Sequence, residues 1–224
     1  MKINPYASWL LSLYLLSSCT HAEQVLSISY VDHPAVATIY LSIIKAMYKE
    51  ADISIELFQV NNSPRSIKAL NDGFFDADIG KILSSIKHRK NIIHVPTPIG
   101  AVGLYLVCRK NITCNESILD DGENLIVSRF NRTMLTNILP IKAEISQIIS
   151  QDRINKMLNL NRVDYSLIAN DTRFGGKSFQ DEFQVIEISR ENYYHILHIK
   201  NQHLISKLNT ALKVVLSKQS KKLN

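Results

Sequence analysis

Short apolar runs alternate along this chain with longer apolar stripes at helical spacing. Apolar residues recur at i, i+3, i+4 and i+7 from Val36 to Met47 and again from Leu204 to Leu216, which predicts amphipathic helices. The predicted strands cover residues 25–31, 53–60, 76–79, 92–95, 102–107, 125–128, 163–169, 185–188 and 194–199. The predicted helices cover about 36–49, 63–70, 153–160 and 204–216. This alternation predicts an α/β fold rather than a sandwich or a helical bundle.

Single residues predict where two of the helices begin. Ser63 and Pro64 are predicted as N-cap and first helical residue, a position where the missing proline N–H costs nothing. Asp171 is predicted to cap a short helix that runs toward Phe179.

The N-terminus has the three parts of a secretory signal over residues 1–22: Lys2, an apolar run over 6–16, and small residues. Cleavage after Ala22 would release the chain, whereas the lipobox-like sequence that ends at Cys19 would attach it to a membrane through a lipid. Both exits place the protein outside the cytoplasm, and the periplasm is the predicted compartment.

The charged residues add little to these predictions. The chain has 26 Lys and Arg against 20 Asp and Glu, and Lys2 is the only charged residue of the predicted signal. Basic residues cluster only at 218–222, where a solvated helix end accounts for them. A nucleic-acid partner is therefore not predicted.

Cys108 and Cys114 are the two cysteines beyond the signal. In an oxidising compartment two nearby cysteines predict a disulfide. Two free thiols are the main alternative, and metal or redox chemistry is a weaker one because the spacing is not Cys-x-x-Cys.

No local motif of a catalytic site occurs in the sequence. His195 and His198 are three residues apart in a predicted strand and so lie on opposite faces, which is a poor arrangement for a metal. We expect no enzyme activity, no cofactor and no metal site.

Four segments, in order over about 190 residues, resemble the bacterial family 3 solute-binding proteins, in the short form often found without an obvious transporter. They are residues 64–81, with a helix, a glycine and an aspartate-led strand; 91–99, with Val95-Pro96; 155–165, with Arg162-Val163-Asp164; and 194–212.

The resemblance implies a type II periplasmic-binding architecture of two α/β lobes, each a mixed sheet flanked by helices. Residues 23–107 and 181–224 would form the first lobe, and residues 108–180 the second. The lobes would close on a small polar or amino-acid-like ligand, in a monomer that serves an ABC-type permease. The alternatives are a sensory module for a membrane signalling protein and a degenerate lobe pair that binds protein.

Receptors of this family hold the ligand's carboxylate with a first-lobe arginine and backbone N–H groups, and its amino group with a second-lobe aspartate. The predicted ligand-binding residues here are Asp32, Arg65, Asp78, Lys81, Arg129 and Asp171. Simpler roles remain open for several: a turn for Asp32, an ion pair for Asp78 with Lys81, and a helix cap for Asp171. The second-lobe segment 126–133 lacks the glycine that is usual in the family.

Overall fold

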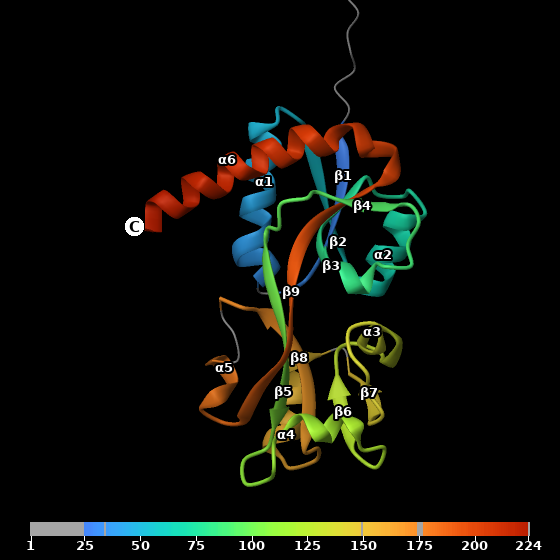
Figure 1. The fold of residues 1–224 in the computed structure, drawn as a ribbon, viewed down its shortest axis with the longest axis vertical. Coiled ribbons are helices and arrows are strands. Elements are labelled where there is room, and N and C mark those ends of the chain that lie inside the picture. The colour runs from blue at the N-terminus through green and yellow to red at the C-terminus, as the bar shows by residue number, and fades with distance from the viewer. Residues whose placement is uncertain (1–24, 34, 149, 174–176, 224) are drawn as a thin grey trace, which may run out of the picture.

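The computed structural model describes residues 25–33, 35–148, 150–173 and 177–223, and the predicted signal with Cys19 lies outside these ranges. Two groups of strands and helices stand one above the other, joined by two long strands (Figure 1). These strands are β5 (Gly100–Cys108) and β9 (Gln184–His198). The α/β class and the two-lobe architecture predicted from the sequence are therefore confirmed.

The first lobe, the upper one in Figure 1, is built on three parallel strands, with β1 between β2 and β3. The end of β9 adds to it antiparallel, between β3 and β4. Its strands are β1 (Leu26–Val31), β2 (Ile55–Val60), β3 (Ala77–Ile82) and β4 (Ile92–His94). Its helices are α1 (Leu41–Glu50), α2 (Ser63–Asn71) and α6 (Ile205–Leu223), and the π-helical turn Val36–Tyr40 leads into α1.

The second lobe has three parallel strands as well, with β6 between β7 and β8, and β5 pairs antiparallel with β8. Its strands are β6 (Leu125–Ser128), β7 (Glu144–Gln147) and β8 (Tyr165–Asp171). Its helices are α3 (Arg132–Thr136), α4 (Gln151–Asn159) and α5 (Lys177–Gln180). The strand order β2-β1-β3-β9-β5-β8-β6-β7 shows that both sheets are mixed and run into one another.

Strand register places the passage between the lobes near residues 100–102 and 191–193. From Val102 to Cys108, β5 pairs with β8, and only residues 193–198 of β9 pair with β3 and β4. This differs from the predicted boundaries at 107/108 and 180/181. The reason is that residues 104–108 alternate between the two faces of the second lobe and help to form its core on each.

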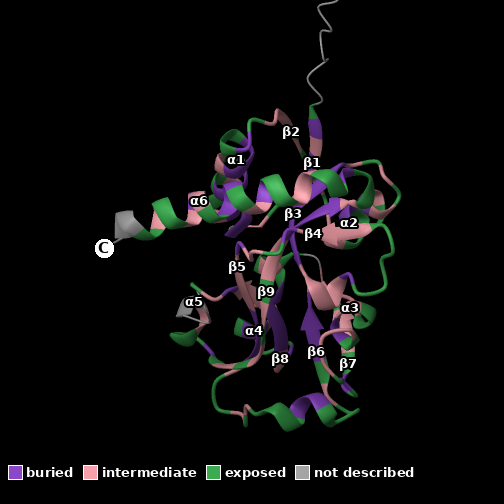
Figure 2. Ribbon diagram, turned by 45° about the horizontal axis from the view of Figure 1, so that its top comes forward, coloured by how far each residue is buried: buried purple, intermediate pink, exposed green. Residues whose placement is uncertain are grey.

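Each lobe has its own hydrophobic core. In the first lobe, Ile44 and Met47 of α1 pack with Leu208 and Leu212 of α6 over the buried Ile28 of β1. Buried residues concentrate on the strands, while the C-terminal end of α6 extends away from the lobe (Figure 2). No described helix is long and apolar enough to cross a membrane.

Three local predictions were wrong. The N-cap of α2 is Asn62, whose side chain accepts the Arg65 N–H at 2.9 Å, so Ser63 is already helical. The strands predicted at 185–188 and 194–199 belong to one continuous strand, β9. The polar residues between them are also in the strand, because this part of β9 crosses between the lobes without a covering helix. Asp171 ends β8 six residues before α5 begins, so it does not cap that helix.

The predicted disulfide is confirmed. Cys108 at the end of β5 bonds to Cys114, with a Cα–Cα distance of 5.8 Å. The Cys108 side chain is fully buried, and Cys114 packs against the same core cluster. The bridge closes the turn that follows β5 at the far end of the second lobe.

We expect the double variant Cys108→Ala/Cys114→Ala to lose about 2 kcal/mol of unfolding free energy, since the bridge closes only a short loop in the unfolded chain. Denaturant titration at equilibrium measures this loss. Added reductant should destabilise the wild type and leave the double variant unchanged. Equal midpoints for the wild type with and without reductant would contradict the expectation.

Candidate functional site

The carboxyl ends of four strands meet between the lobes. β1 and β3 end there from above, and β6 and β8 from below (Figure 1). Ligands of open α/β sheets bind beyond the carboxyl ends of strands, so the chain topology alone selects this cleft as the candidate site. Residues at these ends or just beyond them line the cleft, among them His33, Lys81, Phe130 and Asp171.

The cleft has two adjoining compartments. The apolar compartment is lined mainly by Val36, Tyr40, Val102, Leu104, Met134, Ile138 and Tyr193. The polar compartment combines an apolar wall that includes Leu167 and Ile168 with the polar side chains of Asn61, Asn62, Arg129, Asn131, Gln147 and Gln151. The two compartments share Val31, His33, Ser63, Phe130, Met134 and Ala169, so they form one continuous space to which both lobes contribute. A largely apolar wall with a few polar groups is typical of small-molecule sites.

Asp171 is the central acidic group of the apolar compartment. Its carboxylate is buried and accepts hydrogen bonds from the Tyr40 hydroxyl and from Arg173. Arg173 donates its backbone N–H and Nε to Oδ1, both at 2.8 Å, and Nη2 to Oδ2 at 2.7 Å. Burial alone would raise the pKa of Asp171, but these bonds hold the pKa below its ordinary value.

Gly100 leaves room for this cluster. A Cβ at this position of β5 would lie 2.7 Å from the Tyr40 hydroxyl and 3.0 Å from Nη2 of Arg173. The Arg173 guanidinium in turn lies over the Tyr40 ring, 5.3 Å from its centre. Strand β5, the π-helical turn and the end of β8 therefore pack closely together around the Asp171 carboxylate.

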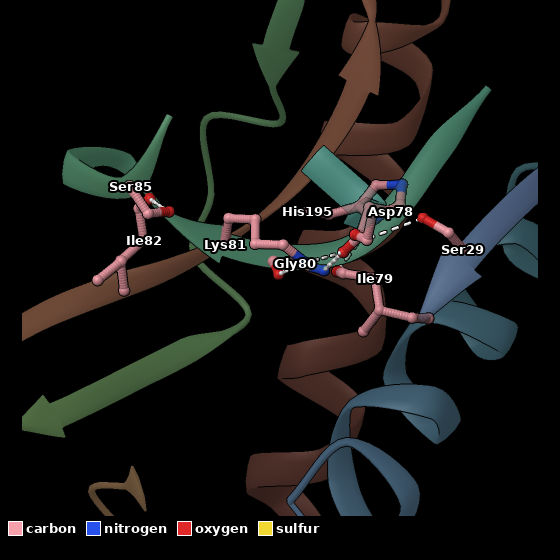
Figure 3. Close-up of polar contacts among 9 residues, drawn as sticks. Ser29, Asp78, Ile79, Gly80, Lys81, Ile82, Ser85 and His195 are labelled. Carbon is pink, nitrogen blue, oxygen red and sulfur yellow. Dashed lines mark hydrogen bonds and ion pairs between the residues drawn. The ribbon is translucent and has the colours of Figure 1, made fainter. Parts of the chain in front are cut away.

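Lys81 and Asp78 form a second, deeper cluster (Figure 3). Lys81 Nζ donates to Asp78 Oδ1 at 2.5 Å and to the Gly80 carbonyl at 3.0 Å, and both side chains are buried. The Asp78 carboxylate also accepts from the hydroxyls of Ser29, at 2.8 Å, and Ser66. The predicted ion pair is therefore observed, and it ties β1, α2 and β3 together behind the cleft wall.

Glu191 lines the apolar compartment where β9 crosses between the lobes. Its carboxylate accepts the Ser84 hydroxyl at 2.5 Å and the Ser84 N–H at 3.3 Å. Ser84 lies in the short turn that follows β3. This contact fastens the crossing strand to the first lobe.

Arg129 is the cation of the polar compartment. Its guanidinium makes no hydrogen bond or ion pair with the other residues that the structure describes. The pKa of nearby His33 is lowered, first by burial and then by the positive charge of Arg129, so His33 is neutral near pH 7. Arg129 is therefore free to hold an anion.

The six predicted ligand residues divide by position. Lys81 and Asp171 line the apolar compartment, Arg129 lines the polar one, and Asp78 lies behind Lys81. Asp32 and Arg65 are exposed and line neither compartment. Contact of any of them with a ligand stays a prediction. Within the described ranges, no three His, Cys, Asp or Glu side chains converge as a metal site would require.

Sequence reasoning missed two residues that line the cleft, Tyr40 and Glu191, and it missed Arg173, which binds the cleft residue Asp171. Tyr40 belongs to the apolar stripe of a predicted helix, a pattern that favours a place in the core. Arg173 follows Asp171 by two residues, a spacing that could have suggested the pair. Glu191 lies in the polar gap between two predicted strands, and this gap was the sign of the crossing.

Neither a protein-family model nor a curated protein matches the chain. Its structure is similar to the GluR0 ligand-binding core from Nostoc punctiforme in complex with L-glutamate, with a TM-score of 0.71, 14% identity and coverage of 88% of this chain and 95% of that one. It is also similar to a histidine kinase sensor domain that resembles periplasmic binding proteins (TM-score 0.71, 13% identity, coverage 90% and 94%). A third similar structure is ArtJ, an arginine-, lysine- and histidine-binding protein from Geobacillus stearothermophilus (TM-score 0.66, 15% identity, coverage 88% and 91%).

In all three cases the similarity extends over nearly the whole of both chains. At such low identity the likeness concerns the fold and not the ligand. The chain has the type II periplasmic-binding fold of the family 3 solute-binding proteins.

Proposed function

We propose that this protein is a receptor that binds a small organic solute in the cleft between its lobes, with no chemical step. The observation that carries the proposal is the single space to which both lobes contribute, at the carboxyl ends of four strands. A ligand in this space would hold the lobes together, and lobe closure is a signal that a membrane partner can detect.

The expected anchor is Arg129. A guanidinium that has no partner within the described part of the chain suits a carboxylate, which it can hold by two parallel hydrogen bonds. Similar structures include receptors for glutamate and for basic amino acids, which carry such a carboxylate. The ligand's body would then occupy the apolar compartment.

We infer a place outside the cytoplasm, supported by the predicted signal at residues 1–22 and by the fold. Delivery of the solute to an ABC-type permease by a monomeric receptor is the first candidate output. Sensing is the second, favoured by the likeness to a histidine kinase sensor domain over 90% of this chain. In that case the closed lobes would act on a membrane signalling protein.

A thermal-shift panel tests the proposal. The protein is unfolded with its disulfide intact, refolded to remove bound ligand, and heated with amino acids, aliphatic and aromatic carboxylates, and polyamines. A ligand that binds only the folded state raises the midpoint, by an amount that grows with its concentration. We expect at least one compound to do so. No shift with any compound, in protein that regains its native circular dichroism, would contradict solute binding.

A further inference from the structure

The Asp171 carboxylate already has a cationic partner within the chain. Both of its oxygens accept hydrogen bonds from Arg173, and Oδ2 also accepts one from the Tyr40 hydroxyl. Asp171 is 1% exposed, whereas the Arg173 side chain is 47% exposed. Four hydrogen bonds, three from Arg173 and one from Tyr40, therefore occupy both oxygens of the acid from inside the protein.

A ligand ammonium at this position would have to replace Arg173. That exchange would give up a bidentate, charge-assisted pair and leave a guanidinium to find a new partner. A carboxylate with its counter-ion in place has no charge left to attract a second cation. We therefore expect Asp171 not to bind a ligand ammonium, the role that the family resemblance implies for a second-lobe aspartate.

Independent features show that the pair is built in. Glycine at position 100 leaves the space that Tyr40 and Arg173 occupy, because a Cβ there would lie 2.7 Å from the Tyr40 hydroxyl and 3.0 Å from Nη2 of Arg173 and would require a neighbour to shift. Tyr40 is held in turn by Tyr193, whose ring centre lies 4.6 Å away. Residues of β5, of the π-helical turn and of β9 therefore pack around the pair that Arg173 forms with Asp171.

The other charged side chains that line the cleft differ in their partners. Lys81 is paired with Asp78, whereas both carboxylate oxygens of Glu191 accept hydrogen bonds from the neutral donors of Ser84. Arg129 remains without an internal partner among the described residues. The described residues of the site therefore offer one cation without an internal partner, Arg129, at the polar end and an apolar chamber beside it.

We propose that the cleft selects small carboxylates with an apolar body and no α-ammonium group, with Arg129 as the anion site and Arg173 as the built-in counter-ion of Asp171. This inference rests on the proposed receptor function and narrows it to a ligand class. Aliphatic and aromatic monocarboxylates meet both requirements, whereas the corresponding amino acids bring a cation for which Asp171 has no free charge.

Matched ligand pairs test the proposal by calorimetric titration of the refolded protein. 4-Methylpentanoate and L-leucine differ only in the α-ammonium group, as do 3-phenylpropanoate and L-phenylalanine. We expect the carboxylate of at least one pair to bind at least tenfold more tightly than its amino acid. Equal or tighter binding of the amino acids would overturn the inference and leave the receptor function standing.

Two variants test whether Arg173 causes the preference for the carboxylate over the amino acid. Arg173→Gln frees the Asp171 carboxylate, so the preference for the carboxylate should shrink or reverse, and Arg173→Lys should restore part of it. Arg190→Gln is the matched control, because Arg190 forms a similar bidentate pair with Glu187 on the exposed face of β9. An unchanged preference in folded Arg173→Gln would contradict the role of Arg173. Binding of polyamines or basic amino acids alone would refute the ligand class, and no binding by any compound would refute the receptor function itself.

Discussion

Replacing Lys81 with methionine is expected to lower the free energy of unfolding by about 3–5 kcal/mol. The Lys81 side chain is 6% exposed and the Asp78 side chain 1% exposed, so neither charge can turn to water. Removal of the ammonium leaves the Asp78 carboxylate with its hydroxyl and backbone donors and without a counter-charge. An unpaired buried charge is among the most destabilising changes that one substitution makes.

The matched control is Lys68→Met in α2. Lys68 pairs with Asp72 one helical turn away, but this pair is exposed to solvent, so we expect little change in stability. The double variant Lys81→Met/Asp78→Asn removes both charges and should recover part of the loss. Denaturant titration measures all three. A loss for Lys81→Met no larger than that for Lys68→Met would show that the buried pair contributes little.

Acid is expected to destabilise the protein between pH 6.5 and pH 4 through His195. This side chain is fully buried and lies between the Tyr48 hydroxyl, 2.8 Å from Nε2, and the Ile79 carbonyl, 3.2 Å from Nδ1. Burial lowers its pKa from 6.5 to about 4, although the bond to the Ile79 carbonyl opposes the shift. The folded state therefore holds the neutral imidazole.

The unfolded chain takes up a proton at His195 near pH 6.5, and the folded chain does so only near pH 4. Stability from this group is complete above pH 6.5 and falls as the pH drops toward 4, by on the order of 3 kcal/mol in total. Denaturant midpoints measured over this range report the loss. His195→Gln should flatten the profile between pH 6.5 and 4. A variant profile with the wild-type slope would assign the acid sensitivity to other groups.

Local patterns were sufficient to predict the α/β class and most elements. Strand β6 was predicted with both ends correct, because its apolar run stops at clear polar residues. The division of β5 and β9 between the lobes was not predictable, since it depends on which helices cover each face. Capping of α2 by Asn62 rather than Ser63 was a choice between two adjacent polar residues that the sequence alone does not decide.

The candidate site, too, could be predicted only in part from local sequence patterns. Topology allowed Asp171 and Arg129 to be selected, because each stands at the end of a strand that points to the cleft. The partner of Asp171 was not predicted. Its geometry depends on Tyr40, 131 residues earlier in the chain, and on space left by Gly100. Contacts between such distant positions arise only in the folded chain.

Calorimetric titration tests most directly whether the cleft is the binding site. The wild type and Arg129→Gln are titrated with the panel compound that gives the largest thermal shift. Arg153→Gln is the control, since Arg153 is an exposed second-lobe arginine on α4 outside both compartments. We predict one binding site per chain, an affinity at least tenfold lower in Arg129→Gln, and no change in Arg153→Gln. Binding that Arg129→Gln leaves unaltered would contradict the account.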